Sequence, residues 1–153
     1  RILDDSEFDP ISPDVPPGEK RFEISISRQE LTAYEGDDIV FQTNIASGAL
    51  TPQKQTPSGE FRVQSTYPSK HMGGTTRDNI YAYVLPGVPW NCFFTEGIAT
   101  HGTYWHNNYG IPQSSGCVNM RNHEAKWLFR WVTPVGGPHD FYKTGFGTRV
   151  SVV

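Results

Sequence analysis

Residues 101–120 contain the three groups that acyl transfer through a thioester requires. Such a reaction needs a thiol that attacks the acyl carbon, a base that accepts the thiol proton, and main-chain N–H groups that stabilise the oxyanion. Cys117 is the candidate nucleophile, and His101, 16 positions before it, is the candidate base. Gly116 permits a sharp turn just before the cysteine, and the amides of that turn can face an oxyanion. The segment therefore indicates a site for cysteine-dependent acyl transfer.

The other cysteine, Cys92, is expected to be structural. It lies in the run Trp-Asn-Cys-Phe-Phe at residues 90–94, which reads as a buried strand, where a free cysteine behaves as a small hydrophobic residue. Cys117 follows Ser-Ser-Gly in a turn, a setting that suits a reactive thiol. A disulfide between the two is the alternative. We favour two unpaired cysteines, of which Cys117 is the reactive one.

The loop between the base and the nucleophile carries three candidate binding residues. Trp105 can form one wall of a peptide cleft, or it can hold the loop in place by packing. The same two roles are possible for Tyr104. His106 can assist protonation, although an imidazole that braces the loop is the commoner arrangement.

Two residues after the cysteine are further candidates. Asn119 can hold the cysteine turn by hydrogen bonding to the main chain, which is typical of asparagine after a sharp turn. The planar fork of Arg121 can bind a substrate carboxylate. The alternative for Arg121 is a solvated position at the start of a helix.

The composition suits one turn-rich domain and excludes several function classes. A chain of 153 residues can form one hydrophobic core, and its 15 glycines and 12 prolines favour short strands over long helices. The net charge of -3 and the lack of a Lys/Arg stripe argue against nucleic-acid binding. No apolar run is long enough to cross a membrane. The five histidines lack the spacing of a zinc site, so we predict no metal and no cofactor.

The elements that must position these residues are mostly strands. Period-2 alternation predicts a strand over residues 22–26 and a hairpin from residues 31–34 and 39–45. Further strands are expected around residues 61–63, 81–85, 90–95, 98–100 and 146–153. One helix follows the cysteine, with Asn122 as its expected N-cap and Pro134 after its end. Its apolar face is formed by Ala125, Leu128, Phe129 and Val132.

Two segments are expected along the chain. Residues 1–20 are rich in proline and acids, and we expect either a linker or an extended arm that packs on the domain. Residues 21–153 form the candidate catalytic domain. The chain opens at Arg1 rather than Met, so we expect a mature or trimmed fragment, in which a missing targeting sequence carries no information about compartment.

These motifs resemble the L,D-transpeptidase catalytic domain family, also called YkuD-type. The family signature is a histidine, a loop, and then Ser/Thr-His-Gly-Cys followed by an apolar residue and Asn or Arg. The sequence Thr-Pro-Ser-Gly-Glu-Phe at 56–61 and the segment that ends at Met72 resemble other family segments, and the resemblance covers about residues 20–153. The residues that match the signature are His101, Ser114, Gly116, Cys117, Val118 and Asn119.

The resemblance implies a mostly β, single-domain, β-sandwich-like fold with one short helix after the catalytic cysteine. It implies that Cys117 attacks the carbonyl after the third residue of a peptidoglycan stem tetrapeptide, that D-alanine leaves, and that a thioester forms. An amine of a neighbouring stem then gives a 3→3 cross-link, water gives carboxypeptidase activity, and a protein amine gives protein anchoring. The Gly102 carbonyl orients His101, and Ser114 and Met72 join the substrate-binding candidates.

The resemblance also implies a cellular setting. The resemblance predicts an extracytoplasmic, monomeric enzyme that acts in peptidoglycan biosynthesis, cell-wall organisation and the control of cell shape. It also predicts that carbapenem β-lactams inhibit this enzyme covalently. No metal, cofactor or nucleic acid takes part.

Ser115 departs from the family pattern, which commonly has histidine at that position. The change removes a second titratable group beside the thiol but leaves His101 in place. It either tunes activity or is a laboratory substitution that weakens it. A third interpretation is a domain that binds wall peptide without turnover.

Overall fold

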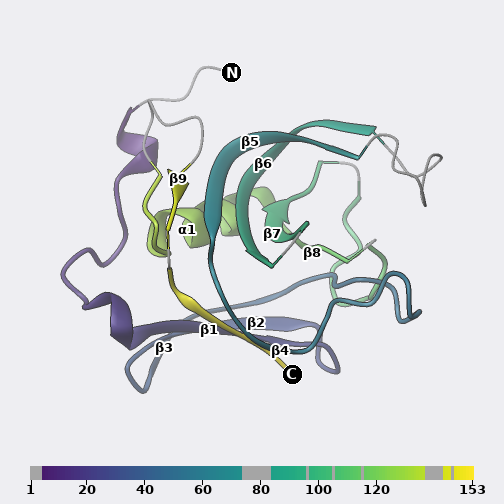
Figure 1. The fold of residues 1–153 in the computed structure, drawn as a ribbon, viewed down its shortest axis with the longest axis horizontal. Coiled ribbons are helices and arrows are strands. Elements are labelled where there is room, and N and C mark those ends of the chain that lie inside the picture. The colour runs from purple at the N-terminus through teal and green to yellow at the C-terminus, as the bar shows by residue number, and fades with distance from the viewer. Residues whose placement is uncertain are drawn as a thin grey trace.

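The part of the chain that the structure describes folds into two five-stranded sheets and one α-helix (Figure 1). The structure is a computed structural model that describes residues 5–73, 84–95, 97–104, 106–114, 116–136, 143–145 and 147–153. The prediction of a mostly β fold with one helix after the cysteine is confirmed. Within the described residues, no helix has the length and apolar character to cross a membrane.

The first sheet contains the predicted hairpin. Its strand order is β3 (Asp38–Asn44), β2 (Glu30–Glu35), β1 (Lys20–Ser25), β10 (Arg149–Val152) and β4 (Gly59–Arg62). The β1–β10 pair is parallel, and the other pairs are antiparallel. Phe22 and Ile24 point into the core, as the alternating pattern of β1 predicts.

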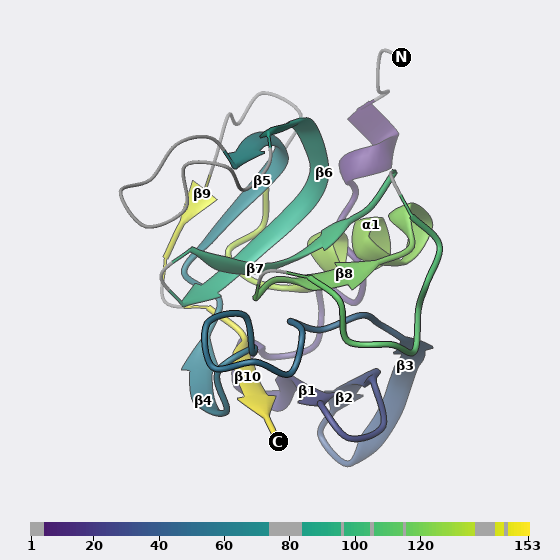
Figure 2. The same ribbon diagram turned by 90° about the vertical axis from the view of Figure 1, so that its right-hand side faces the viewer.

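The second sheet holds the cysteine segment at its edge (Figure 2). Its strand order is β8 (Val118–Met120), β7 (Ile98–Gly102), β6 (Val84–Thr95), β5 (Ser65–Gly73) and β9 (Lys143–Thr144). β7 and β8 are parallel, whereas β6 runs antiparallel to both β5 and β7. Sequence patterning missed β5, because Pro68 and several polar residues interrupt its apolar alternation. The expected strand at 81–85 lies mainly outside the described residues, and so does Phe146.

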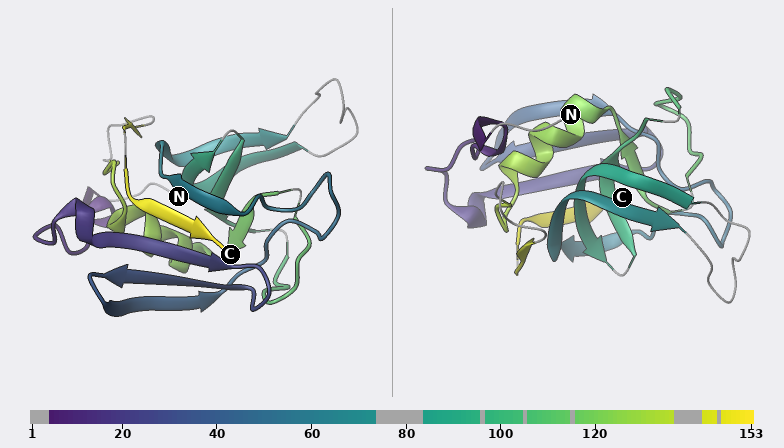
Figure 3. Two further views of the ribbon diagram at one scale, coloured as in Figure 1. Left: turned by 60° about the horizontal axis from the view of Figure 1, so that its bottom comes forward. Right: turned by 90° about the horizontal axis from the view of Figure 1, so that it is seen from above.

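Helix α1 (Asn122–Trp131) lies between the two sheets (Figure 3). Trp127 stacks on Phe41 of β3 with ring centroids 4.4 Å apart, and the indole of Trp131 donates to Glu35 of β2 at 2.8 Å. The expected helical face is correct, but the expected N-cap is wrong. Arg121 is the N-cap residue and makes no side-chain cap hydrogen bond, while Asn122 is the first helical residue. The buried residues of α1 are Ala125, Leu128, Phe129 and Trp131.

The described part of residues 1–20 packs against α1. Phe8 of the short 3-10 helix η1 (Asp5–Phe8) is buried, with its ring centroid 5.6 Å from that of Trp90. Glu7 pairs with Lys126 at 2.7 Å, and Lys20 Nζ donates to the Trp131 carbonyl at 2.9 Å. These contacts hold the described part of this segment against the domain, and the division of the chain at residue 21 stays a prediction.

Candidate active site

The pairing of β7 with β8 brings the two chemically important residues together. Their register sets Thr100 opposite Val118 and His101 opposite Asn119. Continued by one residue, it sets Cys117 beside Ala99, and these two side chains pack in one cluster. Alternate residues of a strand share a face, so His101 and Cys117 point to the same side of the sheet. Both are buried, with 2% and 9% of their surfaces exposed.

Two hydroxyl groups fix the turn that carries the cysteine. Gly116 has φ +128°, and a Cβ there would lie 2.8 Å from Ile98 Cδ1, so only glycine fits. Ser114 Oγ accepts a hydrogen bond from Gly116 N at 3.2 Å and donates to the Cys117 carbonyl. The fully buried Thr56 donates to the Gly116 carbonyl at 2.7 Å and accepts from Gly48 N at 2.9 Å. The main chain around Gly116 is therefore held from both sides.

The imidazole of His101 presents its Nε2 atom as the base. His101 Nδ1 lies 2.8 Å from the Gly102 carbonyl oxygen, which can only accept a hydrogen bond. Nδ1 therefore carries the proton of the neutral ring, and the lone pair is on Nε2. This is the orientation in which imidazole accepts a proton from a nucleophile.

Burial keeps both the thiol and the imidazole uncharged. It raises the pKa of Cys117 to about 11, although a hydrogen bond with the Ala99 main chain opposes the shift. It also lowers the pKa of His101 to about 4; the Gly102 carbonyl opposes that shift and nearby His106 adds to it. The resting site is therefore a neutral thiol–imidazole pair at neutral pH rather than a thiolate–imidazolium pair.

Asn119, which lies opposite His101 in the β7–β8 register, places its side chain against a second histidine. The Asn119 carboxamide lies 2.9 Å from His106 Nε2, while His106 Nδ1 accepts from Asn108 N at 3.0 Å. The main chain of Asn119 pairs with Ala46. The side chain of Asn119 was expected to bond to the main chain of the cysteine turn, whereas the structure directs it to His106. His106 is partly buried, which lowers its pKa.

The other candidate binding residues differ in their exposure and in the partners that they already have. Tyr104 is 52% exposed. Arg121 pairs with Glu124 at 3.2 Å and lies 4.6 Å from the Tyr109 ring centroid, so its guanidinium already has two partners. Trp105 and Ser115 lie outside the described residues, as does the side chain of Met72 in β5.

Sequence reasoning missed a hollow of about 280 Å³ that is lined by two neighbours of Cys117, Gly97 and Phe93, and not by Cys117 itself. Gly97, one of its lining residues, provides the carbonyl oxygen that lies 3.6 Å from Cys117 Sγ. Phe93 lines it too and packs on the cluster that contains Cys117. Lys70 Nζ lies 4.4 Å from the Tyr67 ring centroid in the same hollow. Lys70 belongs to the strand that patterning did not predict, and the family resemblance of residues 69–72 assigned it no role. Among the described residues, no group of three or more His, Cys, Asp or Glu residues could hold a metal ion.

Comparison with known proteins gives one consistent family. Residues 19–152 match the family YkuD, described as the L,D-transpeptidase catalytic domain. A curated relative, the putative L,D-transpeptidase YkuD of Bacillus licheniformis, is 29% identical over 132 residues, which are 86% of this chain and 64% of the relative. This chain thus spans less than two thirds of that relative's length.

Solved structures show the same fold. The catalytic domain of the E. faecium L,D-transpeptidase has a TM-score of 0.66 and 25% identity, over 88% of this chain and 96% of that one. The L,D-transpeptidase LdtMt1 in complex with imipenem has a TM-score of 0.69 and 22% identity, over 88% of this chain and 59% of that one.

Replacing Thr56 with valine should loosen the cysteine turn. Thr56→Val keeps the side-chain volume but leaves the buried Gly48 N–H and Gly116 carbonyl without their partner. We expect the free energy of unfolding to fall by about 2 kcal/mol in urea denaturation. Thr56→Ser keeps the hydroxyl and should lose about 1 kcal/mol or less. A valine variant as stable as the wild type would show that these hydrogen bonds do not hold the turn.

The pKa of His101 should be visible in the pH dependence of stability. The unfolded chain protonates this histidine below its usual pKa of 6.5, whereas folded His101 stays neutral until about pH 4. The unfolded state binds more protons in that window, so stability falls as pH falls, by about 3 kcal/mol from this residue. NMR titration of the His101 ring should give a midpoint near 4, and the His101→Gln variant should lose this share of the pH dependence. A midpoint near 6.5 would contradict the assignment.

Proposed function

Because this chain belongs to the YkuD family of L,D-transpeptidase catalytic domains, we propose that it transfers acyl groups of peptidoglycan stem peptides through a thioester on Cys117. The observation that carries the proposal is the β7–β8 register, which puts a thiol and an oriented imidazole on one face of the sheet. The family resemblance inferred from the signature residues is confirmed.

The proposed acylation step moves one proton and exchanges one bond. Cys117 Sγ attacks the carbonyl after the third residue of a stem tetrapeptide, and the thiol proton passes to His101 Nε2. When the tetrahedral intermediate collapses, the C–N bond to D-alanine breaks, and the His101 proton goes to the leaving amine. The products are a thioester, free D-alanine and neutral His101.

The second step reverses these roles. An acceptor amine attacks the thioester, His101 takes the proton that the amine loses, and the released thiolate recovers a proton from His101. A neighbouring stem as acceptor gives a 3→3 cross-link, water gives a shortened stem, and a protein amine gives an anchored protein.

The neutral resting pair suits this sequence of steps. Burial disfavours a thiolate before substrate binds, so proton transfer accompanies attack on the carbonyl. We assign the Cys117 main-chain N–H to the developing oxyanion, because the glycine turn fixes its direction. The Gly102 carbonyl keeps the ring orientation while the imidazole is transiently charged.

The hollow beside Gly97 is the proposed substrate cleft. Lys70 offers a cation for a stem-peptide carboxylate, and the rings of Tyr67 and Phe93 offer apolar walls. Tyr104, Trp105, His106, Arg121 and Met72 are proposed as flanking binding residues. The hydroxyl of Ser114, also a binding candidate, is bonded to the main chain and therefore acts through the position of the turn.

We place the activity outside the cytoplasm, in cell-wall organisation and the control of cell shape, and we expect a monomer. The location and the cellular role follow from a substrate of peptidoglycan, which is extracytoplasmic, whereas the monomeric state is an expectation from the family resemblance. A wall-binding module with little or no turnover is the second candidate. Ser115 favours it, because the family commonly has histidine beside the thiol at this position.

Acylation by imipenem tests the nucleophile. Intact-protein mass spectrometry of the wild type should show one adduct with the mass of the whole carbapenem, because ring opening expels no leaving group. Cys117→Ala should show none, and Cys92→Ala should keep the adduct, since Cys92 is buried in β6 with a pKa raised by burial to about 12. An adduct that persists in Cys117→Ala, or no adduct on the wild type, would refute the proposal.

Ser115→His tests whether this position tunes the site. A second titratable ring beside the thiol should raise the rate constant of acylation by imipenem, by about a hundredfold if it contributes general acid–base assistance at the low end of that effect. Ser115→Asn, a polar substitution without a titratable ring, is the matched control. Equal acylation rates in all three proteins would show that the position is passive.

A further inference from the structure

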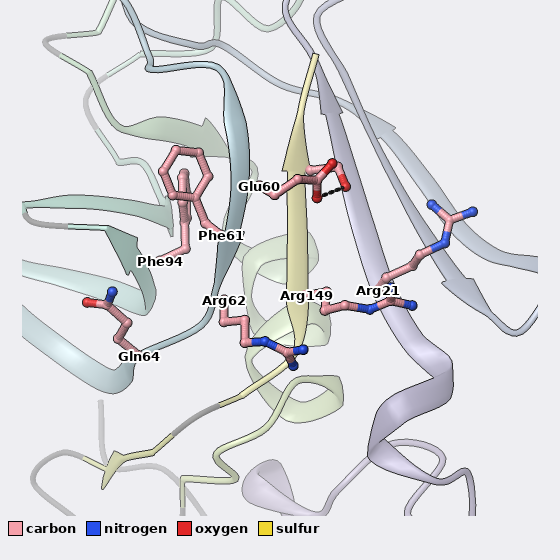
Figure 4. A pocket seen from close by; sticks show the side chains of 8 residues that line it. Arg21, Glu60, Phe61, Arg62, Gln64, Phe94 and Arg149 are labelled. Carbon is pink, nitrogen blue, oxygen red and sulfur yellow. Dashed lines mark hydrogen bonds between the residues drawn. The ribbon is translucent and has the colours of Figure 1, made fainter.

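The hollow of about 760 Å³ on the first sheet indicates no ligand class, because its walls carry both signs of charge (Figure 4). Arg21, Arg149 and Arg62 line it from the neighbouring strands β1, β10 and β4. The carboxylate of Glu60 lines the same hollow. The buried polar side chains of the second sheet are more informative, because two of them have a polar atom that no other group satisfies.

These two atoms are the carboxamide oxygens of Asn91 in β6 and Asn119 in β8, which have no hydrogen-bond partner among the described residues. Asn91 cannot turn its carboxamide around. Its Nδ2 atom donates to the Val88 carbonyl at 2.7 Å and to the Tyr67 carbonyl at 3.3 Å, and an oxygen in that place would face both carbonyls. The Asn119 side chain is bonded to His106 instead, so the state of that ring decides its orientation.

The main chain fixes which nitrogen of His106 carries the proton. His106 Nδ1 lies 3.0 Å from the main-chain nitrogen of Asn108, which carries a hydrogen and can only donate. Nδ1 is therefore the unprotonated nitrogen, and the neutral ring carries its proton on Nε2. Partial burial lowers the pKa of His106, which keeps the ring in this neutral form at neutral pH.

This tautomer decides which end of the Asn119 carboxamide faces His106. Nδ2 of Asn119 lies 2.9 Å from Nε2 of His106, which sets two N–H donors against each other and leaves Oδ1 buried without a partner. Half a turn of the carboxamide exchanges an oxygen and a nitrogen of nearly equal size. Oδ1 then accepts from Nε2–H, so that both unfavourable arrangements are removed, and the NH2 group takes the buried position that the oxygen had.

That position lies on the same face of the sheet as the reacting groups. Asn119 is two residues after Cys117 and pairs in register with His101, so the three side chains point to one side. The ring of His106 is close enough to His101 to lower the pKa of His101. The carboxamide is 2% exposed, and a donor so withdrawn from water binds an oxygen more strongly than an exposed one.

We propose that His106 is a positioning residue for acyl transfer, whose Nε2–H holds the Asn119 carboxamide so that its NH2 group donates to a carbonyl oxygen of the acyl group on Cys117. This inference rests on the proposed acyl-transfer function and adds one hydrogen bond to it. Asn119 is the residue that touches the acyl group, and in this role His106 acts through Asn119. Nε2 keeps its proton when the ring is charged, so both charge states of His106 hold the carboxamide in the same orientation.

Nitrogen NMR of the labelled wild-type protein tests the hydrogen-bonded pair without any reaction. The His106 ring should show a protonated Nε2 and an unprotonated Nδ1 at neutral pH. A protonated Nδ1 would overturn the proposal, because Nε2 would then accept from Asn119 Nδ2 and the carboxamide oxygen would face the reacting groups.

The rate constant of imipenem acylation tests the role of this pair in the reaction. His106→Leu should acylate about tenfold more slowly than the wild type, the loss expected for one substrate hydrogen bond. His106→Gln should recover most of that loss, because its side-chain amide can donate to Asn119 Oδ1. His123→Leu removes an exposed histidine of α1 and should stay within about twofold of the wild type.

A double-variant cycle separates this role from a general structural one. In an Asn119→Ala background, His106→Leu should slow acylation by no more than about twofold further, because His106 acts through a carboxamide that is already absent. Losses that multiply in the double variant, or a His106→Gln variant as slow as His106→Leu, would overturn the proposal. If the Asn119→Ala variants do not fold, the wild-type tautomer and the comparison of His106→Gln with His106→Leu decide. A wild type that imipenem does not acylate would refute the acyl-transfer function itself, whereas normal wild-type acylation with multiplied losses would refute only the role of His106.

Discussion

The parallel pairing of β7 with β8 is the constraint on which the candidate site depends. It is what brings His101 and Cys117, separated by a loop in the sequence, to one face of one sheet edge. Parallel neighbours require a connection that crosses over, and here that connection is itself held down. Gly110 N donates to Ile45 O, and Gln113 and Ser114 N both donate to Ser47 O. The segment after β3 of the first sheet therefore secures the loop that leads to the nucleophile.

Burial sets the electrostatic character of this site. A thiol and an imidazole withdrawn from water both favour their neutral forms, which the opposite directions of the two pKa shifts reflect. The Gly97 carbonyl oxygen lies 3.6 Å from the Cys117 thiol sulfur, and the Gly102 carbonyl oxygen lies 2.8 Å from His101 Nδ1. The site is thus organised by oriented dipoles, which need no rearrangement when charge develops during a reaction.

Much of this arrangement could be predicted from the sequence, because local patterns determine it. Alternation of apolar and polar residues predicted β1 and the hairpin, and the spacing of apolar residues predicted the buried face of α1. The glycine turn before Cys117 indicated that this cysteine is the reactive one. The features that were missed depend on contacts between distant segments. Thr56 holds the cysteine turn through a hydrogen bond to Gly116, 60 residues away in the sequence. Strand β5 is stabilised by its pairing with β6, and the Asn119 side chain contacts His106 instead of the main chain of the turn. The alignment of Arg21, Arg149 and Arg62 likewise depends on the register of three strands whose residues are far apart in sequence. The prediction of Asn122 as the N-cap was wrong because the helix begins one residue earlier in the chain than expected, with Arg121 as its N-cap.

Turnover of a synthetic stem tetrapeptide tests directly whether Cys117 carries the acyl group and His101 moves the proton. D-alanine release and the mass of the peptide products would be followed together for the wild type, Cys117→Ala and His101→Gln. We expect the wild type to release D-alanine in step with formation of a cross-linked or shortened peptide, with no release from Cys117→Ala and greatly slowed release from His101→Gln. Release that continues in Cys117→Ala, or a folded wild-type protein that binds the peptide and releases no D-alanine, would contradict it.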